Sequence, residues 1–89
     1  METNLQFYDR IKADQQERIV LLRLNGFYVT FREDAKKTSE CLGITLTRQF
    51  AGERTYICMF PHNRLDYFLP KLIRHGNKVA ICDKEVDYR

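Results

Sequence analysis

The amino-acid sequence predicts an α/β (α+β) fold in which a small mixed β-sheet carries about three packed helices. Short runs rich in β-branched and aromatic residues recur along the chain, and the segments between them repeat apolar residues at helical spacing. In chain order the pattern is helix, strand pair or one long strand, helix, strand, strand, helix, strand. Such an order predicts helices packed against a mixed sheet.

Length and composition indicate one globular domain over residues 1–89. With 44% hydrophobic and 30% charged residues, the chain has average globular usage and enough apolar side chains for a single core. Lys and Arg number 15 against 12 Asp and Glu, so the net charge of +3 permits contact with a polyanion but supplies only a weak field. The three cysteines are expected to be reduced core thiols. Without an apolar leader or a bilayer-length apolar run, we expect a cytoplasmic protein with no membrane partner.

The first helix is expected from Leu5 to about Gln16, with Asn4 as its N-cap. Its buried face is formed by side chains at helical spacing: Leu5, Tyr8, Ile11 and the stem of Lys12.

A strand pair follows, because Asn25-Gly26 separates two runs of strand composition, residues 19–24 and 27–31. A bulge within one longer strand is the other interpretation. Since side chains alternate across a strand, Phe27, Val29 and Phe31 share one face, and Tyr28 and Thr30 the other. One of these faces must belong to the core.

A second helix should open at Glu33, Asp34 and Ala35 and end at Gly43. Its apolar seam is Ala35, Thr38 and Leu42. Residues 44–49 alternate with period two and predict a half-buried strand, which a loop at residues 51–53 joins to a second strand at 56–60. The two strands are expected to pair.

The third helix is expected to run from an N-cap at Asn63 to His75, with Gly76 after it. Pro70 conflicts with this pattern because it lacks a backbone donor, so a kink or a division is expected there. The apolar face comprises Leu65, Phe68, Leu69, Leu72 and Ile73. Residues 78–82 form a final strand, apolar enough to be central in the sheet.

Six segments stand in one order over nearly the whole chain: Leu-Asn-Gly-Phe-Tyr-Val-Thr-Phe (24–31), Glu-Asp-Ala-Lys-Lys (33–37), Gly-Ile-Thr-Leu-Thr-Arg (43–48), Phe-Pro-His (60–62), Leu-Pro-Lys-Leu-Ile (69–73) and Gly-Asn-Lys-Val-Ala-Ile-Cys (76–82). No single motif is very specific, but the ordered set resembles the N-terminal, mismatch-reading domain of the MutS family of DNA mismatch-repair proteins.

This resemblance implies a module that approaches double-stranded DNA from the minor groove and inserts the phenylalanine of a Phe-x-Glu motif beside a mispaired base. That phenylalanine maps to Phe27, whose alternative role is a core aromatic. An apolar wedge must unstack a base step at a cost of a few kcal/mol, and a mismatch lowers this cost because it is already poorly stacked.

Three departures from the family pattern bear on this reading. Val29 stands where the family has the glutamate that hydrogen-bonds the mispaired base, and it can neither donate nor accept. Asn25-Gly26 replaces the family's Gly-Asp, and Met59 stands where glycine is usual. The chain therefore has the apolar wedge of the family pattern at Phe27, but at Val29 it lacks the residue that hydrogen-bonds the mispaired base.

Arg48, Gln49 and Arg54 bracket the loop before the fourth expected strand and are candidates for phosphate contacts, or for a solvated sheet edge. The candidate DNA-binding residues are thus Asn25, Phe27, Val29, Arg48, Gln49 and Arg54.

No chemistry beyond binding is expected from this sequence. It lacks a Gly-Lys-Ser or Gly-Lys-Thr phosphate loop, the Cys and His spacings match no metal site, and no catalytic constellation is evident. We therefore expect no enzymatic activity, cofactor or metal. The alternative function is a module for protein interaction or self-association, in which Phe27 and Val29 form an exposed apolar pair.

Overall fold

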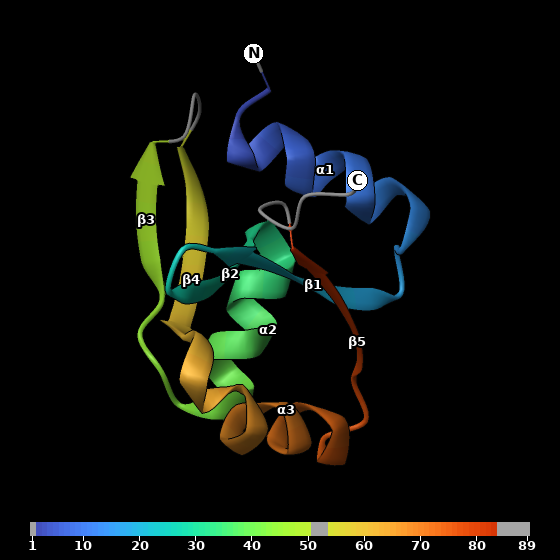
Figure 1. The fold of residues 1–89 in the computed structure, drawn as a ribbon, viewed down its shortest axis with the longest axis vertical. Helices are drawn as coiled ribbons and strands as arrows, with labels where there is room; N and C mark the ends of the chain where they lie inside the picture. Colours follow the sequence, from blue (N-terminus) through green and yellow to red (C-terminus); the bar gives the residue numbers. More distant parts are fainter. Residues whose placement is uncertain (1, 51–53, 84–89) are drawn as a thin grey trace.

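The computed structural model describes residues 2–50 and 54–83, and its centre is a five-stranded mixed sheet (Figure 1). The strand order is β3-β4-β2-β1-β5, in which only the β1–β5 pairing is parallel. The strands are β1 (Arg18–Leu24), β2 (Phe27–Phe31), β3 (Thr47–Phe50), β4 (Arg54–Pro61) and β5 (Lys78–Asp83). The α+β prediction is confirmed.

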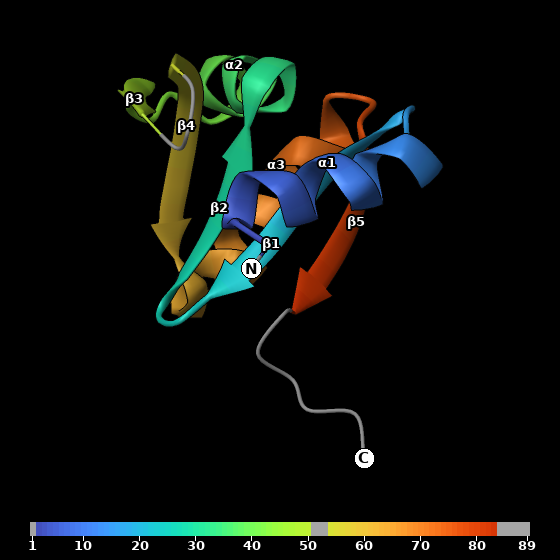
Figure 2. The ribbon, with the colours of Figure 1, turned by 90° about the horizontal axis from the view of Figure 1, so that it is seen from above.

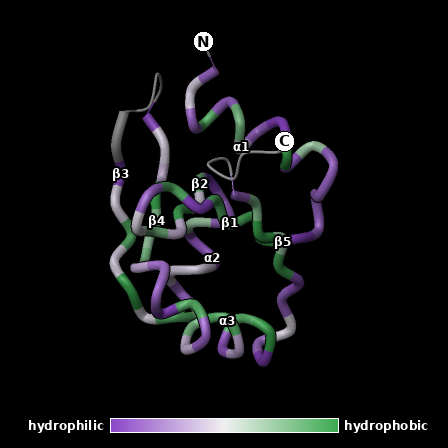
Figure 3. The backbone as a smooth tube through the Cα atoms, in the orientation of Figure 1, coloured by the Kyte–Doolittle hydropathy of each residue, from purple (hydrophilic) through white to green (hydrophobic). Residues whose placement is uncertain are grey.

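Helices cover both faces of the sheet (Figure 2). The helices are α1 (Asn4–Asp14), α2 (Arg32–Leu42) and α3 (Leu65–Arg74), and the short 3-10 helix η1 (His62–Arg64) leads into α3. Residues of α1 share one core cluster with Val29 and Phe31, whereas α2 and α3 share the other with Tyr28 and Phe60. The sheet thus separates two apolar layers. Hydrophilic and hydrophobic residues alternate along α1, as expected for a helix with one buried face (Figure 3).

The turn at Asn25-Gly26 closes a hairpin rather than a bulge, because Leu24 and Phe27 are directly paired across β1 and β2. Asn25 adopts a φ of 53°, which an asparagine tolerates better than most side chains. The predicted alternation is correct: Val29 and Phe31 lie in the core on the α1 side, and Tyr28 lies in the core on the other side.

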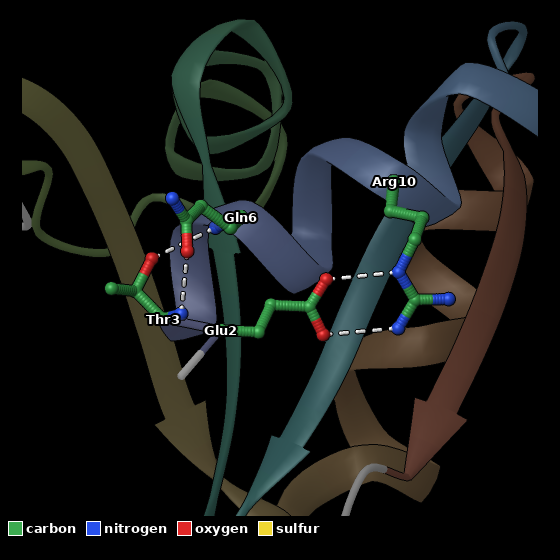
Figure 4. Close-up of polar contacts among 4 residues, drawn as sticks. All are labelled: Glu2, Thr3, Gln6 and Arg10. Carbon is green, nitrogen blue, oxygen red and sulfur yellow. Dashed lines mark hydrogen bonds and ion pairs between the residues drawn. The ribbon is translucent and has the colours of Figure 1, made fainter.

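The N-terminus of α1 corrects the predicted cap, which is Thr3 and not Asn4 (Figure 4). The Thr3 hydroxyl accepts a hydrogen bond from the Gln6 amide at 3.1 Å, and the Gln6 side chain accepts one from the Thr3 amide at 2.9 Å. This reciprocal capping box gives a hydrogen-bond acceptor to two backbone amides, those of Thr3 and Gln6. A single asparagine side chain acting as the cap does not do both. The helix ends at Asp14, short of the predicted Gln16.

Helix α2 begins close to the predicted position and buries its predicted seam of Ala35, Thr38 and Leu42. Gly43 ends it in the left-handed conformation with φ 69°, where glycine carries no Cβ penalty. Arg32, the first residue of α2, has a φ of 56°, and its guanidinium donates two hydrogen bonds of 2.9 Å to the Asp9 carboxylate of α1.

The C-terminal half departs from the predictions in four places. Asn63 does not cap α3, because η1 precedes the helix and no side chain caps it. Ile73 is 56% exposed, outside the buried face. Strand β5 is at the sheet edge, since it pairs only with β1, and the central strand is β2. Strand β3 begins at Thr47, later than predicted. Of the two outcomes expected at Pro70, a kink or a division, the division does not occur, because α3 is one helix with Pro70 exposed inside it.

Candidate nucleic-acid interface

Phe27 lies at the tip of the β1–β2 hairpin, as the first residue of β2. Its side chain is 43% exposed, although its strand neighbours on the same face, Val29 and Phe31, are 5% and 3% exposed. The difference arises because α1 packs on the latter two: Tyr8 of α1 lies edge-on to Phe31, with ring centroids 5.3 Å apart. Phe27 is therefore a surface aromatic on a strand, and not a core residue.

Val29, two residues later, faces the core on the α1 side and offers no surface to a ligand. Its cross-strand partners are Leu22 on β1 and Met59 on β4. Met59 is 43% exposed, so the exposed apolar pair at this end of the sheet is Phe27 and Met59, rather than Phe27 and Val29 as predicted. The alternating pattern of β4 was the available signal, because Ile57 and Met59 share one face.

Backbone and side-chain hydrogen bonds fix the turn that presents Phe27. The Asn25 carbonyl accepts from Arg23 Nε at 2.9 Å, and the Gly26 carbonyl accepts from the His62 amide at 2.8 Å. The second bond ties the hairpin to η1, which follows β4. Asn25 itself is exposed at the tip.

Three basic side chains that the sequence reasoning missed gather around this end of the sheet: Arg23, His62 and Arg64. Arg23 lies on β1 opposite Tyr28, and η1, which holds the other two, directly follows Pro61, the cross-strand partner of Phe27. No carboxylate of the described residues forms an ion pair with Arg23 or Arg64. Arg23 Cζ lies 6.0 Å from the centroid of the Tyr28 ring, and Arg64 Cζ lies 4.9 Å and 6.0 Å from those of Tyr67 and Phe68. Because Tyr28 and Phe68 belong to the core on the α2 and α3 side, both arginines are on the face opposite Phe27.

Arg48 and Arg54 belong to a second cluster, on the β3–β4 hairpin. Arg48 Nη2 donates to the Tyr56 hydroxyl at 2.8 Å, and Arg48 Cζ and Lys36 Nζ lie 4.9 Å and 5.0 Å from the centroid of the Tyr56 ring. A cavity of about 380 Å³ beside the start of α2 is lined by Arg32, Glu33, Arg48, Arg54, Thr55 and Tyr56. The backbone of Gln49 pairs with Thr55 in the same hairpin. The predicted loop at residues 51–53 lies outside the described residues.

The structure does not bring these two clusters together. Phe27 pairs with Pro61 at the end of β4, whereas Arg54 begins that strand, seven positions away or about 23 Å at 3.3 Å per residue. Figure 2 shows the β1–β2 turn at the opposite end of the sheet from the start of β4. Strand alternation also places Tyr56 on the α2 side of the sheet, while Phe27 is on the α1 side.

In the part of the chain that the structure describes, no group of three or more His, Cys, Asp or Glu side chains is placed to hold a metal ion. No helix in residues 2–50 and 54–83 is both long and apolar enough to cross a membrane.

Comparison with known proteins gives a consistent result. The family model of MutS domain I matches residues 2–88. The DNA mismatch repair protein MutS of Porphyromonas gingivalis is 49% identical over 82 residues, which cover 90% of this chain and 9% of the relative. The MutS proteins of Christiangramia forsetii and Bacteroides thetaiotaomicron are 45% and 49% identical over 84 residues, covering 93% and 92% of this chain and 10% of each relative. The chain thus spans about a tenth of the length of these relatives.

Proposed function

Because the chain belongs to the MutS domain I family, we propose that it binds double-stranded DNA at the β1–β2 hairpin, with Phe27 as a wedge that enters the minor groove beside a mismatched or distorted base pair. The observation that carries the proposal is the 43% exposure of Phe27 at the tip of a hydrogen-bonded turn. An exposed aromatic on a rigid support can stack on a base without first rearranging the protein.

Recognition by such a wedge depends on how easily the DNA deforms. A base step that is already poorly stacked yields to the ring at a lower cost than a regular step. Val29 is buried and apolar, so it contributes no hydrogen bond to a base. We therefore propose a preference for mismatched over matched DNA that comes mainly from stacking.

Phosphate contacts are proposed at two places. Arg23, His62 and Arg64 lie at the hairpin end of the sheet, with Arg23 and Arg64 on the face opposite Phe27, and Asn25 is at the tip. Arg48, Gln49 and Arg54 are proposed as a second set that meets the same DNA about 23 Å away, or about seven base pairs at 3.4 Å each. Since strand alternation places Arg48 and Arg54 on the face opposite Phe27, contact with both requires DNA that bends around the edge strand β3.

The test is a fluorescence-anisotropy titration of a labelled duplex with one central G·T mismatch against the matched duplex. We expect tighter binding of the mismatched duplex, and a loss of roughly tenfold or more in affinity for Phe27→Ala, as stacking on one base is worth about 1–3 kcal/mol. Ile73→Ala is the control, because Ile73 is a 56% exposed large apolar side chain near the end of α3.

Three results would contradict the proposal in different ways. No binding at low salt would exclude a DNA-binding module. Equal, salt-sensitive affinity for both duplexes would leave only nonspecific binding. A large loss of stability in Phe27→Ala would mean that the ring serves the fold and not a ligand.

The alternative is a self-association or protein-interaction module, and the exposed pair of Phe27 and Met59 is the observation that favours it. Exposed apolar side chains of this kind are common anchors in protein interfaces. Sedimentation equilibrium would show a dimer that Phe27→Ala dissociates. A monomer at all accessible concentrations would exclude self-association.

A further inference from the structure

The solvent side of α3 exposes apolar and aromatic side chains in one row. Tyr67, Pro70 and Ile73 follow one another at three-residue spacing, which places neighbouring members of the row on the same side of a helix. Tyr67 is 51% exposed and Ile73 is 56% exposed, whereas Leu72, on the side that packs against the sheet, is 0% exposed. With the polar neighbours of Pro70 at four-residue spacing, this surface, here called the α3 outer face, comprises Asp66, Tyr67, Pro70, Ile73 and Arg74, all exposed.

Cations lie beside this row. Arg64 Cζ and Lys71 Nζ are each 4.9 Å from the centroid of the Tyr67 ring. No ion pair within residues 2–50 and 54–83 involves Lys71 or Arg74, and Asp66 is the one acidic residue of α3. The α3 outer face is therefore apolar along its middle and positively charged along one side.

Pro70 also leaves a backbone acceptor on this face without its usual donor. In a regular helix the amide of residue 70 donates to the carbonyl of residue 66, but proline has no amide hydrogen. Helix α3 continues past Pro70 to Arg74, so that acceptor keeps its helical position. A ligand on the α3 outer face can therefore donate a hydrogen bond to the Asp66 carbonyl.

The sheet separates the α3 outer face from Phe27. Helix α3 packs on the side of the sheet that holds Tyr28 and Phe60, and α1 packs on the other side, where Phe27 is exposed (Figure 1). An exposed aromatic ring and an aliphatic side chain beside arginine are typical anchors of protein interfaces. Contacts to a phosphate backbone use cations and polar groups, and give no role to Ile73 or Pro70. The α3 outer face thus fits a protein better than DNA.

We propose that the α3 outer face docks an acidic amphipathic helix of a partner protein. The apolar side of such a helix packs on the apolar row, and its carboxylates pair with Lys71 and Arg74. Charge complementarity favours this occupant over a second copy of the chain, which would bring the same cations together. The inference goes beyond the proposed function, because it adds a protein partner on the side of the sheet opposite the wedge.

The test measures, by fluorescence anisotropy, the binding of a labelled peptide of about 16 residues in which leucines recur at helical spacing among glutamates. The same residues in scrambled order form the control peptide. In amide NMR spectra of the protein, we expect the ordered peptide to shift the signals of α3 and the scrambled peptide to leave them in place. Ile73→Ser should weaken binding roughly tenfold, and Arg74→Glu roughly fivefold, with the second loss shrinking at high salt.

Two variants on the opposite side of the sheet are matched controls. Met59→Ser removes a 43% exposed apolar side chain, and Arg18→Glu reverses an exposed cation at the start of β1. Both should bind the peptide as the unaltered protein does, and urea denaturation shows that each variant is folded.

Amide shifts outside α3, or unchanged peptide affinity of a folded Ile73→Ser, would overturn the proposal. So would a dimer of the protein alone that Ile73→Ser dissociates, which would assign the surface to a second copy. A protein that binds no peptide but loses affinity for a duplex in Arg74→Glu would assign the surface to nucleic acid instead. The proposed function is judged separately, by the effect of Phe27→Ala on DNA binding, so the two can fail independently.

Discussion

One buried carboxylate, Asp34, holds three elements of this fold in register. It is 2% exposed, and its oxygens accept hydrogen bonds from the Tyr8 hydroxyl at 2.6 Å, the Val20 amide at 3.1 Å and Lys12 Nζ at 3.0 Å. Burial, and next the hydrogen bond to Asp34, raise the pKa of Tyr8, so its phenol stays protonated and donates. Helix α1, strand β1 and helix α2 therefore meet at a single side chain.

Asp34→Ala should lower the free energy of unfolding by about 3 kcal/mol, because it leaves a buried amide, a hydroxyl and an ammonium group without their acceptor. Urea denaturation monitored by far-UV circular dichroism measures this loss. Asp9→Ala is the matched control: its carboxylate pairs with Arg32 but is 43% exposed, so the loss should stay below about 1 kcal/mol. Equal losses in the two variants would contradict the role given to Asp34.

A second residue-scale prediction concerns Cys58, in the buried part of β4. Burial raises the pKa of its thiol to about 11 from an ordinary value of 9.0. The folded state therefore binds this proton more tightly than the unfolded chain does. The resulting stability is fully present below about pH 9 and is lost as the pH rises towards 11.

Cys58→Ala removes this titration, so between pH 8 and pH 10.5 the unaltered protein should lose more of its free energy of unfolding than the variant does. Denaturation curves at the two pH values give the comparison. Parallel losses in both proteins would show that Cys58 does not contribute to the alkaline instability.

At the scale of elements, the capping box of Thr3 and Gln6 starts α1 (Figure 4), the helix that packs on Val29 and Phe31 of the sheet. Thr3→Ala removes one of its two reciprocal bonds and should cost about 1 kcal/mol of stability. Thr3→Ser keeps the hydroxyl and should be nearly neutral. Thermal or urea unfolding of both variants tests this, and a Thr3→Ala variant as stable as Thr3→Ser would exclude a stabilising cap.

At the scale of the whole molecule, the two basic clusters lie too far apart for one short duplex. For a duplex of about ten base pairs with a central mismatch, Arg64→Ala should reduce the log-log salt slope by about 0.9, and Arg48→Ala should leave it unchanged. For a duplex of about 24 base pairs, which extends past the distance of about seven base pairs to β3, each variant should reduce the slope by about 0.9. Anisotropy titrations at several salt concentrations measure these slopes. An Arg48→Ala slope that stays unchanged on the long duplex would remove the β3–β4 hairpin from the DNA contact.

Local sequence patterns predicted those features of the fold that depend on residues close together in the chain. The Asn25-Gly26 turn, the alternation of β2 and the seam of α2 are set by neighbours in sequence, and all three are confirmed. The cap at Thr3, the exposure of Ile73 and the edge position of β5 were missed. The cap was within reach of the sequence, because Thr-x-x-Gln at residues 3–6 is the pattern of a capping box. The other two depend on tertiary contacts that a local window does not contain: the packing of α3 on its neighbours and the choice of strand partners.

For the candidate site, the sequence by itself determined that Phe27, Val29 and Phe31 share a face, and that the chain carries the MutS domain I pattern. Only the tertiary structure decided which of the three is available to a ligand, because α1 packs over Val29 and Phe31 and leaves Phe27 exposed. It also placed Met59 beside Phe27, and Arg48 and Arg54 far from it, because strand pairing joins residues that are distant along the chain.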